Sequence, residues 1–356
     1  MQELHISVRN LVEFIFRAGD IDNRAGKLAS AEAMMEGSRI HRKIQKSMDT
    51  SYQAEVPLKI EWKANDYVLV VEGRADGIFT QNEKICIDEI KGVYKNLELL
   101  AEPVLVHRAQ ALCYAWIYLD DHGLEEIDVQ MTYVHLDTEM IKRFRETMTR
   151  EELESWYQRL LDSYHKWLSY QMKWREERNR SMEKLEFPFI YRKGQKEMVA
   201  GIYHAISRKE QIFIQAPTGV GKTMSAVFPA VRSIGEGKAE TLFYLTARTI
   251  TRTVAQDAFE ILRKNGLLFK TVTIIAKEKL CFCEKPECNP ETCPYAKGHY
   301  DRINDAVYEL WTNEQSFDRE TILRQAEKWQ VCPFEMSLDL SVWMDAVICD
   351  YNYVFD

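Results

Sequence analysis

The sequence has no apolar run that approaches the ~20 residues needed to cross a membrane. Its first residues also lack the basic start, the apolar stretch and the cleavage site of a secretory signal. We therefore expect a cytoplasmic, monomeric protein without a membrane partner. The 356 residues contain neither an internal repeat nor a low-complexity segment, and an apolar fraction of 46% is typical of a folded chain rather than a disordered one.

The chain also has no excess of positive charge. Its 47 Lys and Arg side chains are outnumbered by 55 Asp and Glu side chains, so the formal net charge is −8. A protein that coats nucleic acid through bulk charge would carry the opposite sign. This composition still allows a local groove lined by Lys and Arg.

The first part of the chain mixes helical and strand patterns, which predicts an α/β domain over residues 1–148. Apolar residues recur at helical spacing in three segments and alternate as in strands in four others. A turn is expected at residues 73–77, after the second strand. The segments are, in chain order, 8–17, 30–47, 56–62, 67–72, 84–91, 104–118 and 129–135.

A long linker helix is expected over residues 149–182. At its start, Thr149 and Glu152 form a capping box in which each side chain satisfies a free backbone amide. Beyond it, strands and helices alternate, which suggests a parallel sheet with helices on its faces. This second domain spans residues 183–356, with a cysteine-rich insertion at about 277–335. The alternating segments are 211–215, 223–233, 241–246, 251–264, 271–275 and 346–349.

An apolar strand at 212–214 leads into Ala-Pro-Thr-Gly-Val-Gly-Lys-Thr at 216–223, and a helix follows. The backbone amides of such a loop and the helix N-terminus form a nest for phosphate oxygens. The glycines let the backbone approach, the Lys reaches the outer phosphates, and the last Thr offers its hydroxyl to Mg²⁺. The sequence therefore predicts a site for ATP and Mg²⁺ with these contacts: Thr218, Gly219, Gly221, Lys222 and Thr223.

This loop resembles the phosphate loop of superfamily 2 helicases, whose motor domains have a RecA-like fold. The resemblance extends upstream to Tyr-Arg-Lys-Gly-Gln at 191–195 and implies that Gln195 contacts the adenine base. It extends downstream to Leu-Thr-Ala-Arg-Thr at 245–249, where such helicases touch the DNA backbone, and implies DNA contacts for Thr246 and Arg248. DNA, single-stranded or with single-stranded tails, is therefore the expected partner.

Cysteines are concentrated in the second domain. Three of the eight, Cys86, Cys113 and Cys349, lie in apolar runs and are typical of small core residues. The other five fall between residues 281 and 332, and in a cytosolic chain such clustering indicates metal ligands rather than disulfides. Four thiolates can hold Zn²⁺ or an iron–sulfur cluster, and the spacing alone does not decide between them.

The position of these cysteines resembles that in the XPD/DinG group of helicases, where an inserted domain carries a 4Fe-4S cluster. The sequences Cys-Pro-Phe at 332–334 and Val-Ile-Cys-Asp-Tyr-Asn-Tyr at 347–353 carry the resemblance further. A structural zinc site and reduced thiols are the alternatives, and the choice between Cys281 and Cys283 stays open. The resemblance implies a 4Fe-4S cluster with these ligands: Cys281, Cys288, Cys293 and Cys332.

Two carboxylates and a lysine are close together in the strand pattern of the first domain. Asp76 lies in the expected turn, whereas Glu89 and Lys91 share one face of the next strand and Asp88 points to the other face. Carboxylate oxygens suit Mg²⁺ or Mn²⁺, which polarise a phosphate and acidify an attacking water. Lys91 would orient that water or offset developing charge. This set predicts metal-assisted hydrolysis of a phosphodiester.

Three further residues fit this set. His41 lies on the preceding helix as a candidate third metal ligand, and Gln110 and Tyr114 are four apart on a later helix, so they share a face. In this order the residues resemble the RecB-like branch of the PD-(D/E)xK nucleases. The resemblance implies that the carboxylates and the lysine are catalytic and that Gln110 and Tyr114 contact DNA. A nuclease fold without activity, which only guides DNA into the helicase, is the alternative.

The pair Asp-Glu occurs only at residues 88–89, in the first domain. A motor of this family needs such a pair, in the form Asp-Glu-x-His, to hold Mg²⁺ and activate water. We therefore expect a fragment that lacks this motif and the second motor lobe and does not hydrolyse ATP by itself. The intact protein would couple 5′ to 3′ translocation on single-stranded DNA to strand cleavage in repair. A zinc-stabilised ATP-binding module without a nucleic-acid role is the remaining alternative.

Overall fold

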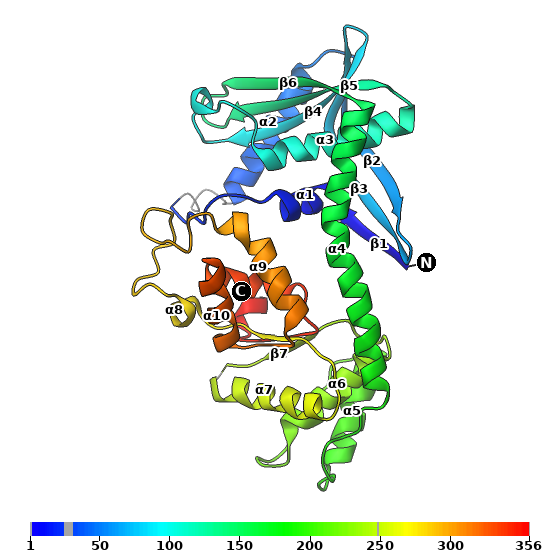
Figure 1. Ribbon diagram of the computed structural model, residues 1–356, viewed down its shortest axis with the longest axis vertical. Helices are drawn as coiled ribbons and strands as arrows, with labels where there is room; N and C mark the ends of the chain where they lie inside the picture. The colour runs from blue at the N-terminus through cyan, green and yellow to red at the C-terminus, as the bar shows by residue number, and fades with distance from the viewer. Residues whose placement is uncertain (1, 25–30, 248, 356) are drawn as a thin grey trace. The chain divides into compact units, whose positions relative to one another are not determined.

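The computed structural model describes residues 2–24, 31–247 and 249–355 (Figure 1). The chain divides into two compact units. The first contains Met1–Ala18 and Asn23–Lys166, and the second contains Gly19–Asp22 and Trp167–Asp356. Within the part of the chain that the structure describes, no helix is long and apolar enough to cross a membrane.

A six-stranded sheet forms the centre of the first unit. Five strands follow the order β1-β3-β4-β5-β6, and β2 pairs with β3. The β1–β3 and β4–β5 pairs are parallel, whereas β2–β3, β3–β4 and β5–β6 are antiparallel. The strands are β1 (Gln2–Ser7), β2 (Gln53–Lys63), β3 (Tyr67–Gln81), β4 (Lys84–Val93), β5 (Glu126–His135) and β6 (Ile141–Thr149).

Three helices accompany this sheet. Helices α1 (Val8–Phe16) and α2 (Ala31–Ser47) precede its hairpins, and α3 (Leu105–His122) connects the parallel strands β4 and β5. A parallel pair needs such a crossover, because a tight turn cannot return the chain to the same end of the sheet. The structure therefore confirms an α/β arrangement in the first part of the chain.

The turn expected at residues 73–77 is wrong, because β3 continues without interruption to Gln81. The hairpin turn lies instead at Asn82 and Glu83, whose φ angles of 52° and 64° are left-handed. The glycines that suggest a turn are needed for packing. A Cβ at Gly73 would lie 2.7 Å from the Tyr114 hydroxyl, and one at Gly77 would overlap the ring of Tyr52.

Helix α4 (Arg150–Glu183) follows β6, a strand that the sequence patterns did not reveal. The capping box at its start is confirmed. The backbone N–H of Thr149 donates to Glu152 Oε2 at 2.9 Å, and the N–H of Glu152 donates to Thr149 Oγ1 at 3.3 Å.

The second unit contains a parallel four-stranded sheet of order β7-β10-β8-β9. The segment between β8 and β10 holds the five clustered cysteines, three helices of nine residues or more and the short strand β9. The strands are β7 (Leu242–Leu245), β8 (Thr271–Thr273), β9 (Ser316–Phe317) and β10 (Ala346–Cys349). The helices are α5 (Gln195–Arg208), α6 (Lys222–Gly235), α7 (Thr249–Lys264), α8 (Lys277–Leu280), α9 (His299–Asn313), α10 (Arg319–Trp329), α11 (Pro333–Ser341) and α12 (Asn352–Phe355).

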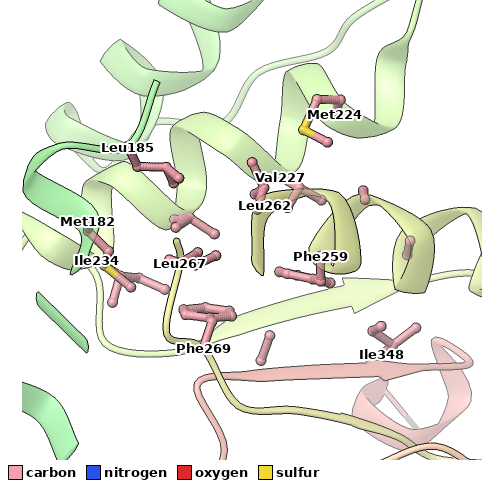
Figure 2. Packing of buried hydrophobic residues seen from close by; sticks show 14 residues of the cluster. Met182, Leu185, Met224, Val227, Ile234, Phe259, Leu262, Leu267, Phe269 and Ile348 are labelled. Carbon is pink, nitrogen blue, oxygen red and sulfur yellow. The ribbon is translucent and has the colours of Figure 1, made fainter. Parts of the chain in front are cut away.

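A buried apolar cluster joins α6, α7, β10 and the end of α4 (Figure 2). Val227 of α6, Phe259 of α7 and Ile348 of β10 are each no more than 1% exposed. Phe259 also stacks on Phe269 with ring centroids 5.5 Å apart. Burial of this apolar surface fixes α6 and α7 against the sheet, and the phosphate loop precedes α6 directly.

The strand expected at residues 211–215 is not formed. Phe213 is 94% exposed, and the segment pairs with no strand among the described residues. A strand exists only as part of a hydrogen-bonded ladder, so an apolar run without a neighbouring strand stays irregular.

Candidate functional sites

The predicted acidic residues of the first unit meet at the junction of β3 and β4. Asp76 Oδ2 accepts a hydrogen bond from the backbone N–H of Ile90 at 2.7 Å. His41 of α2 places its Nδ1 3.4 Å from Asp76 Oδ1. Burial lowers the pKa of His41, but the hydrogen bond to Asp76 and the charge of that carboxylate outweigh it, so the net shift is upward.

Glu89 is the most deeply buried of these groups, at 1% exposure. Lys91 Nζ lies 2.7 Å from its Oε1 as an ion pair, yet neither carboxylate oxygen has a partner in hydrogen-bond geometry. Burial raises the pKa of Glu89 to about 8, and the charge of Asp76 adds to this effect while Lys91 opposes it. A buried carboxyl with unsatisfied oxygens is costly unless a proton or a cation reaches it.

The two predicted DNA contacts of α3 belong to the same cluster. Lys91 Nζ donates to Gln110 Oε1 at 3.1 Å, and Tyr114 is hydrogen-bonded to Gln110 and to the backbone of Arg74. Burial is the main reason that the pKa of Tyr114 rises to about 12. An open cleft of ≈660 Å³ exposes Lys91 and Gln110. The structure thus brings together all six predicted residues: His41, Asp76, Glu89, Lys91, Gln110 and Tyr114.

Asp88 faces the other side of β4, as the strand alternation predicts. Its carboxylate accepts hydrogen bonds from Thr132 at 2.6 Å, Gln130 at 3.0 Å and Tyr52 at 3.2 Å. Burial raises the pKa of Asp88, although these three hydrogen bonds oppose the shift. Asp88 is therefore a satisfied core carboxyl, whereas Glu89 lies with Asp76 and Lys91 on the side of the candidate site.

The donor set of this cluster suits a hard divalent cation. Among residues 2–24, 31–247 and 249–355, no three His, Cys, Asp or Glu side chains are already arranged to hold a metal ion. The carboxyl oxygens of Glu89 accept no hydrogen bond, and the charge of Asp76 acts on Glu89 as well, so a cation between the two carboxylates would lower the cost of burying Glu89. Carboxylate and imidazole ligands of this kind fit Mg²⁺ or Mn²⁺.

The predicted nucleotide contacts line one open pocket of ≈600 Å³. Gly219 and Gly221 have φ angles of +83° and +80°, which L side chains rarely adopt, and α6 begins directly after them. Lys222 Nζ donates to the carbonyls of Ala216 and Pro217, both at 2.9 Å. The pocket wall contains all six predicted residues: Gln195, Thr218, Gly219, Gly221, Lys222 and Thr223.

Gln195 and Arg192 join the segment before α5 to the phosphate loop. Gln195 Oε1 accepts from the N–H of Arg192 at 3.0 Å, and its Nε2 would lie 2.6 Å from a Cβ at Gly221. The guanidinium of Arg192 donates to the carbonyl of Gly219. Sequence reasoning missed Arg192 as a pocket residue, although its place in the 191–195 segment was the available signal.

The five clustered cysteines line one small, mostly apolar cavity, together with Lys277. Cys283 Sγ lies 3.9 Å from Cys293 Sγ, and all five thiols are free. Burial raises the pKa of Cys283 to about 11, with the neighbouring thiols adding to the shift, and burial likewise raises the pKa of Cys332 to about 11. Lys277 is hydrogen-bonded to Cys288. This thiol-rich set fits an iron–sulfur cluster or zinc by its chemistry.

The predicted DNA contacts beside β7 are only partly described. Thr246 is buried at the carboxyl end of β7, and its N–H donates to the carbonyl of Cys349 at 3.0 Å. Arg248 lies outside the described residues.

Two protein families match the second half of the chain. Residues 192–281 match the DEAD/DEAH box helicase family, and residues 266–356 match the family DEAD_2. These matches support a superfamily 2 helicase domain with an ATP site in this part of the chain.

The curated relatives described here share only low sequence identity with this chain. The regulator of telomere elongation helicase 1 homolog of Caenorhabditis briggsae is 22% identical over 220 residues, and that of Caenorhabditis elegans is 22% identical over 216 residues. The alignments cover 49% and 48% of this chain but only 22% of each relative. A crystal structure of SSO0001 aligns at a TM-score of 0.31 and 19% identity, covering 45% of this chain and 77% of that one.

Proposed function

We propose that the chain combines a DNA helicase motor of the XPD/DinG type with a metal-dependent nuclease of the PD-(D/E)xK type. The observation that carries the nuclease half is the meeting of a buried carboxyl, a second carboxylate and a lysine, of which the lysine lines an open cleft. The motor half is supported by the helicase family matches and by the phosphate loop that lines the nucleotide pocket. DNA with single-stranded segments is the proposed substrate, and repair is the proposed setting.

In the nuclease site, each residue has a separate task. Asp76, Glu89 and His41 would hold Mg²⁺ or Mn²⁺, which supplies Lewis acidity toward the scissile phosphate. Lys91 is held between Glu89 and Gln110, so its ammonium can orient a water and offset charge on the phosphate. Gln110 and Tyr114 lie beside it and would position the DNA strand.

In the motor, the backbone of residues 216–223 would cradle the phosphates of ATP. Lys222 would exchange its present carbonyl acceptors for phosphate oxygens, which are stronger partners because they are charged. Gln195 and Arg192 would close the pocket on the side of the base.

In the cysteine-rich segment, the proposed cofactor is a 4Fe-4S cluster, which would fix the chain between β8 and β10. Cys281, Cys288, Cys293 and Cys332 are the proposed ligands, and the ammonium of Lys277 would offset the negative charge of the thiolates. Zinc is the second candidate, for a specific reason. Tetrahedral Zn–S bonds of ~2.3 Å place sulfurs about 3.8 Å apart, and Cys283 and Cys293 have this separation.

The test of the nuclease half is Mn²⁺-dependent cleavage of labelled single-stranded DNA by the purified chain, without ATP. Lys91→Ala and Asp76→Ala should each remove cleavage, whereas Lys63→Ala, an exposed charge on β2, should not. Unchanged cleavage in both site variants would refute the nuclease assignment.

A second candidate function is a nuclease fold that guides DNA without cutting it. The arrangement of Lys91 favours this reading, because its ammonium already neutralises Glu89 at 2.7 Å where a metal would bind. DNA binding without cleavage in either Mg²⁺ or Mn²⁺, with the same affinity for Lys91→Ala, would support it.

A further inference from the structure

A short segment between α1 and α2 belongs to the second unit. Gly19–Asp22, which we call the strap, is grouped with Trp167–Asp356, whereas Ala18 and Asn23 on either side of it belong to the first unit. Holding a loop in one conformation costs conformational entropy, which contacts must offset. The contacts of the strap within the second unit therefore indicate its role.

The strap is hydrogen-bonded to residues 296–301, which end the cysteine-rich loop and begin α9. On the main chain, the N–H of Ile21 donates to the carbonyl of Ala296 at 2.9 Å. In the opposite direction, the N–H of Tyr300 donates to the carbonyl of Gly19 at 2.9 Å. The two bonds together fix the register of the strap on this turn.

Two carboxylates add to these main-chain bonds, one from each side. Asp301 Oδ1 accepts from the N–H of Gly19 at 2.8 Å, and Asp20 Oδ1 accepts from the N–H of Gly298 at 2.6 Å. Hydrogen bonds to an ionised group are stronger than those between neutral groups. The strap is therefore docked by specific bonds and does not merely pass over the surface.

Ile21 is the contribution of the strap to the cysteine cavity. Its side chain is 4% exposed and lines the same cavity as the five clustered cysteines. Residues 281–298, between α8 and α9, form neither helix nor strand, so no regular ladder of hydrogen bonds holds the loop that carries four of these cysteines. A buried apolar side chain at this place keeps water from the thiols and packs the loop.

The turn that holds the strap also contacts two of the proposed metal ligands. The N–H of Ala296 donates to the carbonyl of Cys293 at 3.1 Å. His299 Nδ1 accepts from the N–H of Cys332 at 3.1 Å. Residues 296–301 therefore touch the strap and the ligands at once, so a change at one is transmitted to the other.

We infer that the docked strap closes the cysteine cavity and retains the metal centre, and that the metal centre in turn keeps the strap docked. The inference rests on the proposed metal centre, and it applies to an iron–sulfur cluster and to zinc alike because it concerns the closure of the cavity. Linkage makes the effect reciprocal: the factor by which the strap tightens metal binding is the factor by which the metal favours docking. Because the strap connects α1 to α2, the metal centre restrains the chain that leads into the helix of His41.

Release of the metal to a chelator tests the retention of the metal centre by the strap. The full chain is purified anaerobically and mixed with an excess of an iron chelator, or of a zinc chelator for a zinc-loaded chain, and the released metal is followed by absorbance. Ile21→Ala should speed release by roughly 10-fold or more, and Asp20→Ala by roughly 2- to 10-fold. Asp20→Asn keeps an accepting oxygen and should release metal at nearly the wild-type rate. Val342→Ala and Asp66→Ala, at exposed positions, are the matched controls.

Hydrogen exchange tests the effect of the metal on the strap. The amides of Gly19 and Ile21 should exchange several-fold faster in the full chain after removal of the metal, because undocking exposes both N–H groups to water. Exchange in β4 and β5 of the first unit should not change. Binding of a fluorescent ATP analogue checks that each variant keeps the second unit folded, and if Ile21→Ala fails this check, Asp20→Ala and Asp20→Asn decide.

Three outcomes would overturn the inference, and they separate it from the proposed function. A loaded wild-type chain whose strap variants release metal at the wild-type rate would exclude the strap and leave the metal centre. Unchanged exchange at Gly19 and Ile21 after removal of the metal would exclude the reciprocal link. A wild-type chain with neither iron nor zinc after anaerobic purification would remove the proposed metal centre and the inference together.

Discussion

The side chain of Asp76 and the backbone of Ile90 join β3 to β4 by a hydrogen bond of 2.7 Å. The regular pairing of these two strands ends at Gly77 and Asp88, so beyond this point a carboxylate takes the place of a main-chain acceptor. The opening between the strands is where Glu89 and Lys91 lie, on either side of Ile90 in the sequence. The same contact thus completes the sheet and positions the candidate catalytic groups.

Asp76 should therefore affect both activity and stability, and two substitutions separate these effects. Asp76→Asn keeps an oxygen that can accept from Ile90, whereas Asp76→Ala leaves that N–H unsatisfied. We expect both to reduce Mn²⁺-dependent cleavage by roughly 10- to 100-fold or more, because removal of even an outer-shell partner of a bound metal costs about that much. Only Asp76→Ala should lower the free energy of unfolding by about 1–3 kcal/mol. Urea titration and the cleavage assay measure the two effects, and equal stability of both variants would contradict this role of the hydrogen bond.

The buried carboxyl of Glu89 predicts a pH dependence of stability. Its pKa of about 8 in the folded protein is above its ordinary value of 4.5. The folded chain therefore keeps a proton that the unfolded chain releases, so this group lowers the free energy of unfolding as pH rises from about 4.5 to about 8, and the loss is complete above that. Lys91, Asp76 and His41 face the group and contribute to its pKa.

Glu89→Gln removes this titration and tests the sign. In EDTA, the variant should gain stability over wild type between pH 5 and pH 8, by on the order of a few kcal/mol. Added Mn²⁺ should raise the free energy of unfolding of the wild-type chain at pH 8, because the cation takes the place of the proton that Glu89 loses at this pH. Glu98→Gln, an exposed substitution in the same unit, is the control. Parallel stability curves for Glu89→Gln and wild type would rule out a proton on this carboxyl.

Two glycines of the first unit should respond in opposite directions to the same change. A Cβ at Gly77 would overlap the ring of Tyr52, which also donates a hydrogen bond to Asp88. Gly77→Ala should therefore destabilise the fold by about 1–3 kcal/mol or more. Gly37 of α2 has nothing within 4 Å of its Cβ position, so Gly37→Ala should stabilise the fold by roughly 0.5–1 kcal/mol. Thermal unfolding of both variants checks the contrast, and a neutral Gly77→Ala would mean that Tyr52 moves freely.

The strands β3 and β4 show why the sequence predicted some features of the fold and not others. Strand alternation is local, so it correctly separated Glu89 and Lys91 from Asp88. The run from Gly73 to Gly77 was interpreted as a turn, because a glycine that fits beneath a tyrosine from a distant segment has no local signature.

Pairing partners were the other feature that local patterns could not supply. Strand β6 was missed because its side chains alternate only between exposed and partly buried positions, and many of them are charged. Residues 212–214 are apolar as in a strand, yet no described strand pairs with them. The six candidate nuclease residues were predicted from the order of helices and strands along the chain. The folded sheet keeps that order, so these residues lie together in the structure.

The nucleotide pocket predicts a graded series of binding defects. Lys222→Ala should weaken a fluorescent ATP analogue by roughly 10- to 100-fold, which corresponds to the loss of a charged hydrogen bond. Arg192→Ala should have a smaller effect, because its guanidinium holds the carbonyl of Gly219 and so supports the loop. Lys209→Ala, beyond the end of α5, is the control. If Lys222→Ala and wild type bound the ATP analogue equally well, residues 216–223 would not be the phosphate-binding loop.

The cysteine cavity predicts which thiols hold the proposed cluster. Cys281 directly follows α8, and its N–H donates to the carbonyl of Lys277 at 2.9 Å, whereas Cys283 lies in the loop beyond. An anchored thiol is the better ligand because less conformational freedom is lost on binding.

We expect anaerobically purified protein to contain iron and acid-labile sulfide, and expect Cys281→Ala, Cys288→Ala and Cys332→Ala to lose both. Cys283→Ala should retain iron, as should Cys86→Ala in the first unit. Stoichiometric zinc without iron would decide for the zinc site, and loss of metal in Cys283→Ala but not Cys281→Ala would reverse the choice of the first ligand.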